Sequence, residues 1–266
     1  MAALRVFWRE MIPFIHLGPL MVPTFGLMIA AAMVAAYYVL RADMARRGLA
    51  AKDTSTAEMF VAVPALCGIV GAKLYHVLET PREFLADPVG QLFSRYGLAW
   101  FGGLIAGFAA FVWLARKFKY PMLQIFDAGS AAAALGYGVG RIGCLLSGDG
   151  DYGVPTSLPW GMSFPNGLVP TTELVHPTPI YELIAACAIA WILWRMGATR
   201  TRRPGVVFAA YLILTGVARF LVEFIRINPR SFLGMTNAQA ASVLSVVAGV
   251  AVWRYVGRRA PTARPC

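Results

Sequence analysis

The chain alternates between long apolar runs and short polar segments along nearly its whole length. A run of about 18 or more apolar residues can cross about 30 Å of hydrocarbon as a helix. The runs predict seven such helices, over residues 17–40, 58–78, 98–115, 123–146, 179–196, 206–225 and 238–256. No internal repeat or linker interrupts them. The pattern therefore predicts an all-α integral membrane protein, with residues 1–266 forming a single membrane-embedded domain.

Composition agrees with a membrane protein. Hydrophobic residues make up 58% of the chain and charged residues 14%, whereas ordinary globular proteins are about 25% charged. The fourth run, 123–146, is rich in glycine and alanine, and small residues let helices approach closely in lipid. We therefore expect this helix to pack inside the bundle.

The basic residues are divided unevenly between alternate loops. One set of loops, with the C-terminal tail, contains fifteen: Arg41, Arg46, Arg47, Lys52, Arg116, Lys117, Lys119, Arg195, Arg200, Arg202, Arg203, Arg254, Arg258, Arg259 and Arg264. The alternate set contains six: Arg5, Arg9, Arg82, Arg95, Arg226 and Arg230. By the positive-inside rule the first set is cytoplasmic, so the N-terminus lies outside and the C-terminus inside.

The distribution of basic residues also indicates where an external segment lies and which partners are not expected to bind. Residues 147–178 contain no Lys or Arg and are rich in Gly and Pro, so we expect a small periplasmic head built from turns between spans 4 and 5. The net charge of +11 could suggest nucleic acid. Because the charge sits in short clusters between apolar runs, we expect no nucleic-acid partner.

Three basic residues, Lys73, Arg141 and Arg219, lie inside or at the edge of apolar runs, as do the acids Asp127, Glu182 and Glu223. A charge at the centre of a span costs roughly 2.5–3.5 kcal/mol on insertion scales, so it normally faces a cavity or a partner. These positions therefore predict a polar site within the membrane.

Two of these charges also have purely structural explanations. Lys73 is close enough to the end of its span to snorkel to the interface. Arg219 and Glu223 are four residues apart and could form a purely structural ion pair. Arg141 lies among glycines, where open space beside its guanidinium suits bidentate binding of a phosphate.

The segment after Arg141 is expected to form a turn that exposes Asp149 and Asp151. It resembles part of a calcium loop but lacks the twelfth-position acid of an EF-hand. No CxxC or HExxH motif occurs, and Cys144 lies in an apolar segment. We expect no metal site and no cofactor.

Seven short motifs follow one another along the chain: Phe25–Met28, Gly71–Tyr75, Gly102–Ile105, Gly140–Gly143, Pro159–Met162, His176–Glu182 and Arg219–Phe224. Each is weak alone, but the ordered set is specific. It resembles the prolipoprotein diacylglyceryl transferases of bacteria, a family of multi-pass enzymes of the inner membrane. Seven spans with an external N-terminus also match that family.

The resemblance implies transfer of the diacylglyceryl group from phosphatidylglycerol to the lipobox cysteine thiol of prolipoproteins, with release of glycerol 1-phosphate. Such a reaction needs a thiolate nucleophile and positive charge on the departing phosphate. The resemblance implies that Arg141 and Arg219 act at the phosphate, with Glu223 orienting Arg219. It also implies Asp149 and Asp151 at the catalytic mouth. Further substrate contacts are expected from Lys73, Gly143, Cys144, Gly153, His176, Phe25 and Phe101, in a site open to membrane lipid.

Several positions differ from the family's usual pattern. Phe25 replaces a tyrosine, Phe101 replaces a histidine, and Cys144 replaces an asparagine. Ser147 and Asp149 stand at a second asparagine and a glutamate. Because phenylalanine cannot take a proton, the base must lie elsewhere: Asp149, Asp151, Glu223 or His76. Alternatively, the arginines lower the pKa of the acceptor thiol sufficiently by themselves.

Two residues allow more than one interpretation, and so does the function. His176 could act as a base, or could cap its loop through local hydrogen bonds. Cys144 could be a nucleophile or a small buried residue. The altered positions also favour a second hypothesis, the same fold and lipid donor with a different acceptor. A non-catalytic lipid-binding or transport protein is a third, although the chain lacks the repeats of transporters.

Overall fold

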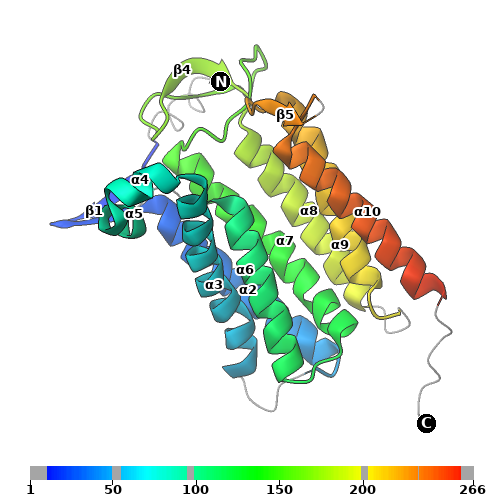
Figure 1. Ribbon diagram of the computed structural model, residues 1–266. Coiled ribbons are helices and arrows are strands. Elements are labelled where there is room, and N and C mark those ends of the chain that lie inside the picture. The colour runs from blue at the N-terminus through cyan, green and yellow to red at the C-terminus, as the bar shows by residue number, and fades with distance from the viewer. Residues whose placement is uncertain (1–10, 50–54, 95–98, 199–202, 233, 259–266) are drawn as a thin grey trace, which may run out of the picture. The chain divides into compact units, whose positions relative to one another are not determined.

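The computed structural model describes residues 11–49, 55–94, 99–198, 203–232 and 234–258. Long helices dominate these ranges, and short two-stranded sheets precede α2 (Thr24–Arg46), follow α7 (Met122–Ser147) and follow α9 (Val206–Val222) (Figure 1). The chain divides into two compact units. The smaller contains residues 44–125, and the larger contains the residues up to Asp43 and those from Phe126 onward.

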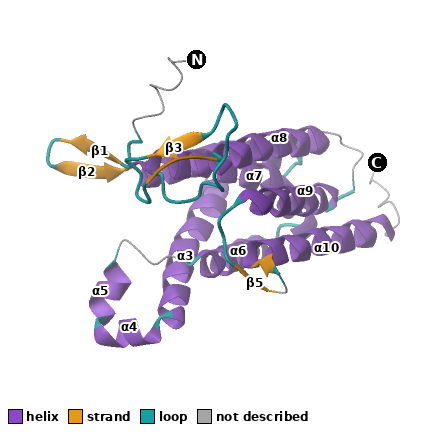
Figure 2. Cartoon of the chain, turned by 90° about the horizontal axis from the view of Figure 1, so that it is seen from above, coloured by secondary structure: helices purple, strands orange, loops and turns teal. Residues whose placement is uncertain are grey.

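The larger unit is built on five helices: α2 (Thr24–Arg46), α7 (Met122–Ser147), α8 (Thr178–Ala198), α9 (Val206–Val222) and α10 (Asn237–Arg258). Helix α9 packs against both α8 and α10 (Figure 2). A core of Ala131, Ala134, Ile189, Ala190, Leu193, Val207 and Ala210 joins α7, α8 and α9. The small residues of α7 are thus in contact with other helices, as predicted for the fourth run.

Two capping arrangements fix the ends of these helices. Asp127 on α7 accepts hydrogen bonds from the backbone N–H groups of Gly205 (2.8 Å) and Phe208 (2.7 Å) at the start of α9. At the start of α10, Thr236 and Gln239 each accept the other's backbone N–H at 3.1 Å, which is a capping box. The buried carboxylate of Asp127 therefore caps a helix, which accounts for one of the acids within the apolar runs.

The smaller unit contains α3 (Ser55–Glu79), α4 (Pro81–Ala86), α5 (Pro88–Phe93) and α6 (Trp100–Lys117). Helices α3 and α6 approach closely through glycines. A Cβ added at Gly71 would lie 2.6 Å from the carbonyl oxygen of Gly102, and one at Gly103 would lie 3.2 Å from that of Gly68. The short helices α4 and α5, each beginning with a proline, were not predicted from the sequence.

Three antiparallel hairpins complete the described chain: β1 (Phe14–Leu17) with β2 (Leu20–Pro23), β3 (Met162–Phe164) with β4 (Thr171–Val175), and β5 (Arg230–Phe232) with β6 (Met235–Thr236). The segment 147–178 has a small core of its own, in which Tyr152 stacks on Phe164 with ring centroids 5.2 Å apart. The predicted turns therefore form a structured piece around the β3–β4 hairpin.

The predicted start of the first span is wrong. The sequence predicted a helix over 17–40, but residues 14–23 form the β1–β2 hairpin and α2 begins at Thr24. Gly18 adopts a positive φ of 62° at the turn, and Pro19 follows it. Hydropathy cannot distinguish a short apolar strand from the first turns of a helix.

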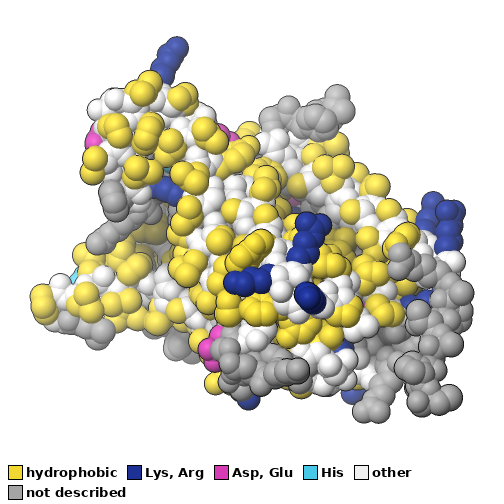
Figure 3. Space-filling view, turned by 60° about the horizontal axis from the view of Figure 1, so that its bottom comes forward, with side chains coloured by type: hydrophobic (Ala, Val, Ile, Leu, Met, Phe, Trp, Pro, Cys, Tyr) yellow, Lys and Arg dark blue, Asp and Glu magenta, His cyan; other side chains and the backbone are white. Residues whose placement is uncertain are grey.

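Five helices of the described ranges are long and apolar enough to cross a membrane: α2, α3, α8, α9 and α10. Only 11% to 28% of the residues in their most apolar stretches are buried within the protein. Many large hydrophobic side chains on these helices are exposed, and hydrophobic side chains cover much of the face in Figure 3. Such exposure is costly in water and suits lipid, so the fold is that of a multi-pass membrane protein. Helices α6 and α7 match the third and fourth predicted spans but are outside this set of five.

Candidate active site

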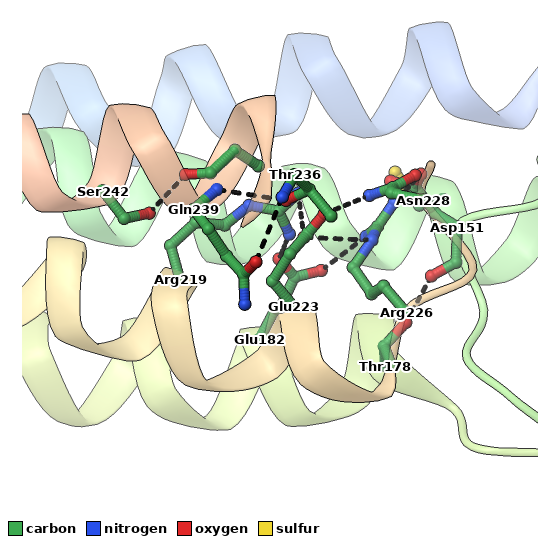
Figure 4. A network of polar contacts seen from close by, with 12 residues as sticks. Asp151, Thr178, Glu182, Arg219, Glu223, Arg226, Asn228, Thr236, Gln239 and Ser242 are labelled. Atoms are coloured by element: carbon green, nitrogen blue, oxygen red, sulfur yellow. Dashed lines mark hydrogen bonds and ion pairs between the residues drawn. The ribbon is translucent and has the colours of Figure 1, made fainter. Parts of the chain in front are cut away.

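Segments far apart in the sequence meet around the carboxylate of Glu182, in the second turn of α8 (Figure 4). Oε1 of Glu182 accepts hydrogen bonds from the Tyr137 hydroxyl at 2.6 Å and from Arg219 Nη1 at 2.7 Å. Oε2 lies 3.2 Å from Nε of Arg141 and 3.4 Å from Nη1 of Arg226. Only 4% of this side chain is exposed. Glu182 therefore holds three guanidinium groups in one place.

Arg141 reaches this cluster from the last two turns of α7. Its Nη1 pairs with the carboxylate of Asp151 and its Nη2 donates to the Tyr137 hydroxyl at 2.8 Å. The guanidinium also lies 4.8 Å from the centroid of the Tyr137 ring, within the range of a cation–π contact. The side chain is 13% exposed, so part of it remains open to a ligand.

Arg219 and Glu223 lie four residues apart at the end of α9, and they pair as the sequence predicted. Arg219 Nη2 is 2.9 Å from Glu223 Oε2. The Glu223 side chain has no exposed surface, and its Oε1 accepts a 2.5 Å hydrogen bond from the Asn228 side chain. The pair is not isolated, because Arg219 also binds Glu182. Arg219 is 25% exposed, the most open of the three arginines.

Arg226 was interpreted from the sequence as an ordinary loop charge, and the structure corrects this. Its Nη2 pairs with Asp151, its Nη1 with Glu182, and its Nε lies 3.7 Å from Glu223 Oε2. Only 6% of the side chain is exposed. A signal was present in the sequence, since Arg226 follows Glu223 by three residues just after an apolar run. That spacing continues the helical face of Arg219 and Glu223.

The backbone around Gly153 brings Arg226 to Asp151. Gly153 N–H donates to the carbonyl of His176 at 2.8 Å, and Val154 N–H donates to the carbonyl of Ile225 at 2.8 Å. A Cβ at Gly153 would collide with the Ile225 carbonyl and lie 3.0 Å from the Cβ of His176. This glycine therefore permits the end of α9, the start of α8 and the segment after α7 to meet. Gly153 was expected to contact substrate, and in the structure it lies where close backbone packing needs a glycine.

Asp151 bridges two arginines from the mouth of the cluster. One carboxylate oxygen pairs with Arg141 and the other with Arg226. Its side chain is 31% exposed, more than any of the other five charged side chains of the cluster. Burial raises the pKa of Asp151, but the guanidiniums of Arg226 and Arg141 lower it further, so it lies below its ordinary value.

Asp149 occupies a different environment two residues earlier. Its Oδ1 accepts the Asp151 backbone N–H at 3.2 Å. Burial and the negative charge of Asp151 raise the pKa of Asp149, and hydrogen bonds from Cys144 and from the backbone offset this only in part. The two carboxylates thus have pKa values shifted in opposite directions, a pattern found where one group carries protons and the other carries charge.

The Cys144 sulfur lies beside both carboxylates, within a 4.8 Å group of possible metal ligands. Arg141 Nη1 is 3.6 Å from Sγ, and Asp151 is already paired with two arginines. A bound cation would meet those positive charges at close range. The prediction that the site needs no metal stays a prediction.

Other predicted substrate residues lie at the edges of the larger unit. A Cβ at Gly143 would lie 3.2 Å from the Phe25 ring, so α2 and α7 touch there. His176 Nδ1 is 3.2 Å from the Tyr181 hydroxyl, which also accepts from Trp160 Nε1 at 2.8 Å. His176 therefore has the local hydrogen bond expected of a loop cap, and its role towards substrate is untested.

Lys73, His76 and Phe101 belong to the smaller unit. Lys73 is buried, and its Nζ donates to Ser94 Oγ at 2.8 Å and to the Ser94 carbonyl at 3.1 Å. Phe101 packs edge-on against Trp100, with centroids 5.3 Å apart. These contacts give Lys73 and Phe101 local partners, and their roles towards substrate remain predictions.

Three arginines and three carboxylates in mutual contact thus make up a site at one end of α7, α8 and α9. Guanidinium groups bind phosphate through paired hydrogen bonds, and exposed faces of Arg141 and Arg219 remain. A helical membrane protein with such a site is a membrane enzyme or binding protein for anionic, phosphate-bearing ligands.

Comparison with known proteins narrows that class. The family model described as prolipoprotein diacylglyceryl transferase matches residues 13–255. A phosphatidylglycerol–prolipoprotein diacylglyceryl transferase of Geobacter sulfurreducens is 33% identical over 225 residues, 84% of each chain. Enzymes of the same name from Clostridium tetani (31% identity, 86% of this chain and 91% of the relative) and Paracidovorax citrulli (34%, 72% and 73%) are also similar. The chain belongs to the prolipoprotein diacylglyceryl transferase family.

Proposed function

We propose that the protein transfers the diacylglyceryl group from phosphatidylglycerol to the lipobox cysteine thiol of prolipoproteins and releases glycerol 1-phosphate. Family membership and the names of its relatives support this reaction. The observation that carries the proposal is the convergence of Arg141, Arg219 and Arg226 around Glu182. Fixed positive charge of this kind stabilises a phosphate as it gains negative charge on leaving.

The reaction is a displacement at a primary carbon. The acceptor thiol loses its proton to a base. The thiolate then attacks the carbon of the diacylglyceryl group that is bonded to the phosphate oxygen. A carbon–sulfur bond forms, the carbon–oxygen bond breaks, and its electron pair goes to the phosphate oxygen. The proton then passes to the leaving phosphate or to water, so that glycerol 1-phosphate departs and the thioether remains.

Asp149 is the best-suited base among the expected candidates. Its raised pKa makes it a better proton acceptor than an ordinary carboxylate. Glu223 is fully buried against Arg219 and Asn228, so an acceptor thiol has poorer access to it. Asp151 is held ionised by two arginines. With Phe25 and Phe101 unable to take a proton, Asp149 supplies the function that the family's histidine was expected to supply.

The arrangement in the membrane is part of the same proposal. Helices α6 and α7 join the five apolar helices as spans three and four, with the N-terminus outside and the C-terminus in the cytoplasm. Residues 147–178 then form a periplasmic head at the outer leaflet of the bacterial inner membrane. Both units act as a single transferase domain, so that lipid and signal-sequence cysteine reach the site laterally from membrane lipid.

Complementation of a strain depleted of its own diacylglyceryl transferase tests the proposal. Wild type should restore lipidation of a model prolipoprotein. Arg141→Ala should lower the rate by at least about 100-fold, the typical loss for a group that stabilises developing charge. Arg226→Gln should cost at least about tenfold, since it removes one of the three positive charges and takes one arginine partner from each of Asp151, Glu182 and Glu223.

Arg195→Ala is the matched control. Arg195 lies on α8 as Glu182 does, but it is exposed at the far end of the helix against Trp191, and its loss should leave the rate unchanged. If correctly inserted wild type leaves the prolipoprotein unmodified, the reaction proposed here is wrong. The altered Phe25, Phe101 and Cys144 would then favour a different acceptor with the same lipid donor.

A further inference from the structure

The charge balance of the cluster limits what can bind to it. Arg141, Arg219 and Arg226 already face Asp151, Glu182 and Glu223. A phosphodiester carries one negative charge, so its entry would leave an excess of negative charge unless a carboxylate withdraws. Uncompensated charge in a partly buried site is unfavourable enough to offset the affinity of a weak ligand. One of the three carboxylates must therefore leave when an anionic lipid binds.

Only Asp151 is placed to leave. The side chains of Glu182 and Glu223 are 4% and 0% exposed, and each has further hydrogen-bond donors, from Tyr137 and Asn228 respectively. The Asp151 side chain is 31% exposed and lies on a loop. Gly150 precedes it with φ of 92°, so the chain turns sharply just before the carboxylate. Asp151 can reach water by side-chain rotation, whereas the glutamates cannot.

The position of Asp151 also matches that of a phosphate. Its two oxygens each pair with a different guanidinium, one on Arg141 and one on Arg226. Two non-bridging oxygens of a phosphodiester can make the same two contacts. We propose that the Asp151 carboxylate occupies the lipid-phosphate subsite between Arg141 and Arg226 in the lipid-free protein, and that the phosphate of the donor displaces it.

This inference rests on the proposed function for its choice of ligand, and it deepens the account of that site. The groups that face Asp151 are Arg141 and Cys144 on α7, Asp149 on its own loop, Arg226 after α9, and Glu182 on α8 through the shared arginines. Because two guanidiniums keep Asp151 ionised, it neutralises the arginines until lipid arrives. Once displaced, its carboxylate can accept hydrogen bonds from the glycerol hydroxyls of the headgroup.

Lipid binding without acceptor tests the inference. Full-length protein in neutral detergent would be titrated with short-chain phosphatidylglycerol, and the half-saturating concentration read from thermal stabilisation. Asp151→Asn removes the competing charge and should lower that concentration about five- to tenfold. The gain corresponds to one partly exposed charge-assisted pair that the lipid no longer has to break. Asp151→Glu keeps the charge and should show no gain. Phosphatidylcholine of equal chain length reports binding that does not depend on the headgroup.

Glu173→Gln is the charge-matched control. Glu173 is an exposed carboxylate on β4 of the same segment, and its removal changes the net charge equally while leaving the arginine cluster with all of its carboxylates. If Asp151→Asn binds phosphatidylglycerol as wild type does, or more weakly, Asp151 is a fixed part of the site and the inference is wrong. Asp151→Ser replaces the asparagine variant if that does not yield folded protein.

Failure of the inference and failure of the proposed reaction can be told apart. The titration contains no acceptor. Wild type that binds phosphatidylglycerol but does not modify prolipoprotein would therefore contradict the proposed reaction, while the displacement of Asp151 would still be supported by the Asp151→Asn result. Wild type with no preference for phosphatidylglycerol over phosphatidylcholine would contradict the inference that the lipid phosphate displaces Asp151. The lipidation assay would then decide the reaction by itself.

Discussion

Glu182 contacts three guanidinium groups and one phenol hydroxyl through two carboxylate oxygens. Buried charges are tolerated when they are paired and their remaining hydrogen-bonding capacity is used. In this cluster each arginine touches two carboxylates or more, and each carboxylate touches at least two arginines. The paired carboxylates thus stabilise the arginine charges near lipid, and the exposed parts of the guanidinium groups can still bind a phosphate.

At the same scale, Asp149→Asn tests the proposed base. The variant should lose about 10²- to 10⁴-fold in transfer rate at neutral pH, the usual contribution of a positioned base. Its rate should rise with pH up to about 8.5, where the acceptor thiol ionises without help. Wild type should lose activity as the pH falls through the pKa of Asp149, which lies above the ordinary value. The measurement is the pH profile of kcat/KM with a purified lipobox peptide.

Asn at position 149 preserves size and can still accept the Asp151 backbone N–H, so the loop should keep its shape. A variant with the rate of wild type at pH 7 would show that Asp149 is not the base. The arginines themselves would then be responsible for lowering the pKa of the acceptor thiol.

Helix packing in the smaller unit depends on close backbone contact between α3 and α6. Gly71 and Gly102 face each other so closely that a Cβ on Gly102 would collide with the Gly71 carbonyl and with Tyr75. In lipid, where apolar surface gives little drive for helices to associate, such close packing supplies much of the attraction. The glycines of this pair therefore act as packing residues.

Gly102→Ala should destabilise the α3–α6 pair by about 1–3 kcal/mol, since the added methyl group has no space. The expected result is a lower unfolding temperature of the purified protein in detergent. Gly257→Ala on α10 is the control, because a Cβ there meets nothing within 4 Å. Equal unfolding temperatures for the two variants would contradict the close contact.

At the scale of the whole molecule, the seven-span arrangement depends on whether α6 and α7 cross the membrane. Arg116 and Lys117 in the last turn of α6 and Lys119 in the link to α7 are predicted to be cytoplasmic, whereas the segment containing α4 and α5 is predicted to lie outside. Fusions ending after Asp87 and after Lys119 should therefore differ. Alkaline phosphatase should be active only after Asp87, and green fluorescent protein should fluoresce only after Lys119.

A five-span protein would give a different pattern. If α6 and α7 did not cross, both fusion points would lie on the outer side and both phosphatase fusions would be active. Fusions after Arg258 would report the cytoplasm in either case, because both arrangements contain an odd number of spans. The position after Lys119 is thus the one that decides between them.

The sequence by itself determined the features that depend on local pattern. The apolar runs predict the membrane helices because hydropathy over about 20 residues is a local property. Five are apolar enough to span, and α6 and α7 were recognised as helices. Arg141, Arg219 and Glu223 were found because a charge inside an apolar run is costly enough to need a reason. The ordered motifs identified the family that the comparisons then confirmed.

Only the tertiary structure decided which charges meet. Arg226 looks like a loop charge in the sequence, and Glu182 like one acid among several, until the ends of α7, α8 and α9 place them 3.4 Å apart. Asp151 could not be assigned to two arginines, one of them 75 residues away in the chain. Contacts between distant segments depend on helix packing and on backbone approach at Gly153, and no periodicity along the chain encodes them.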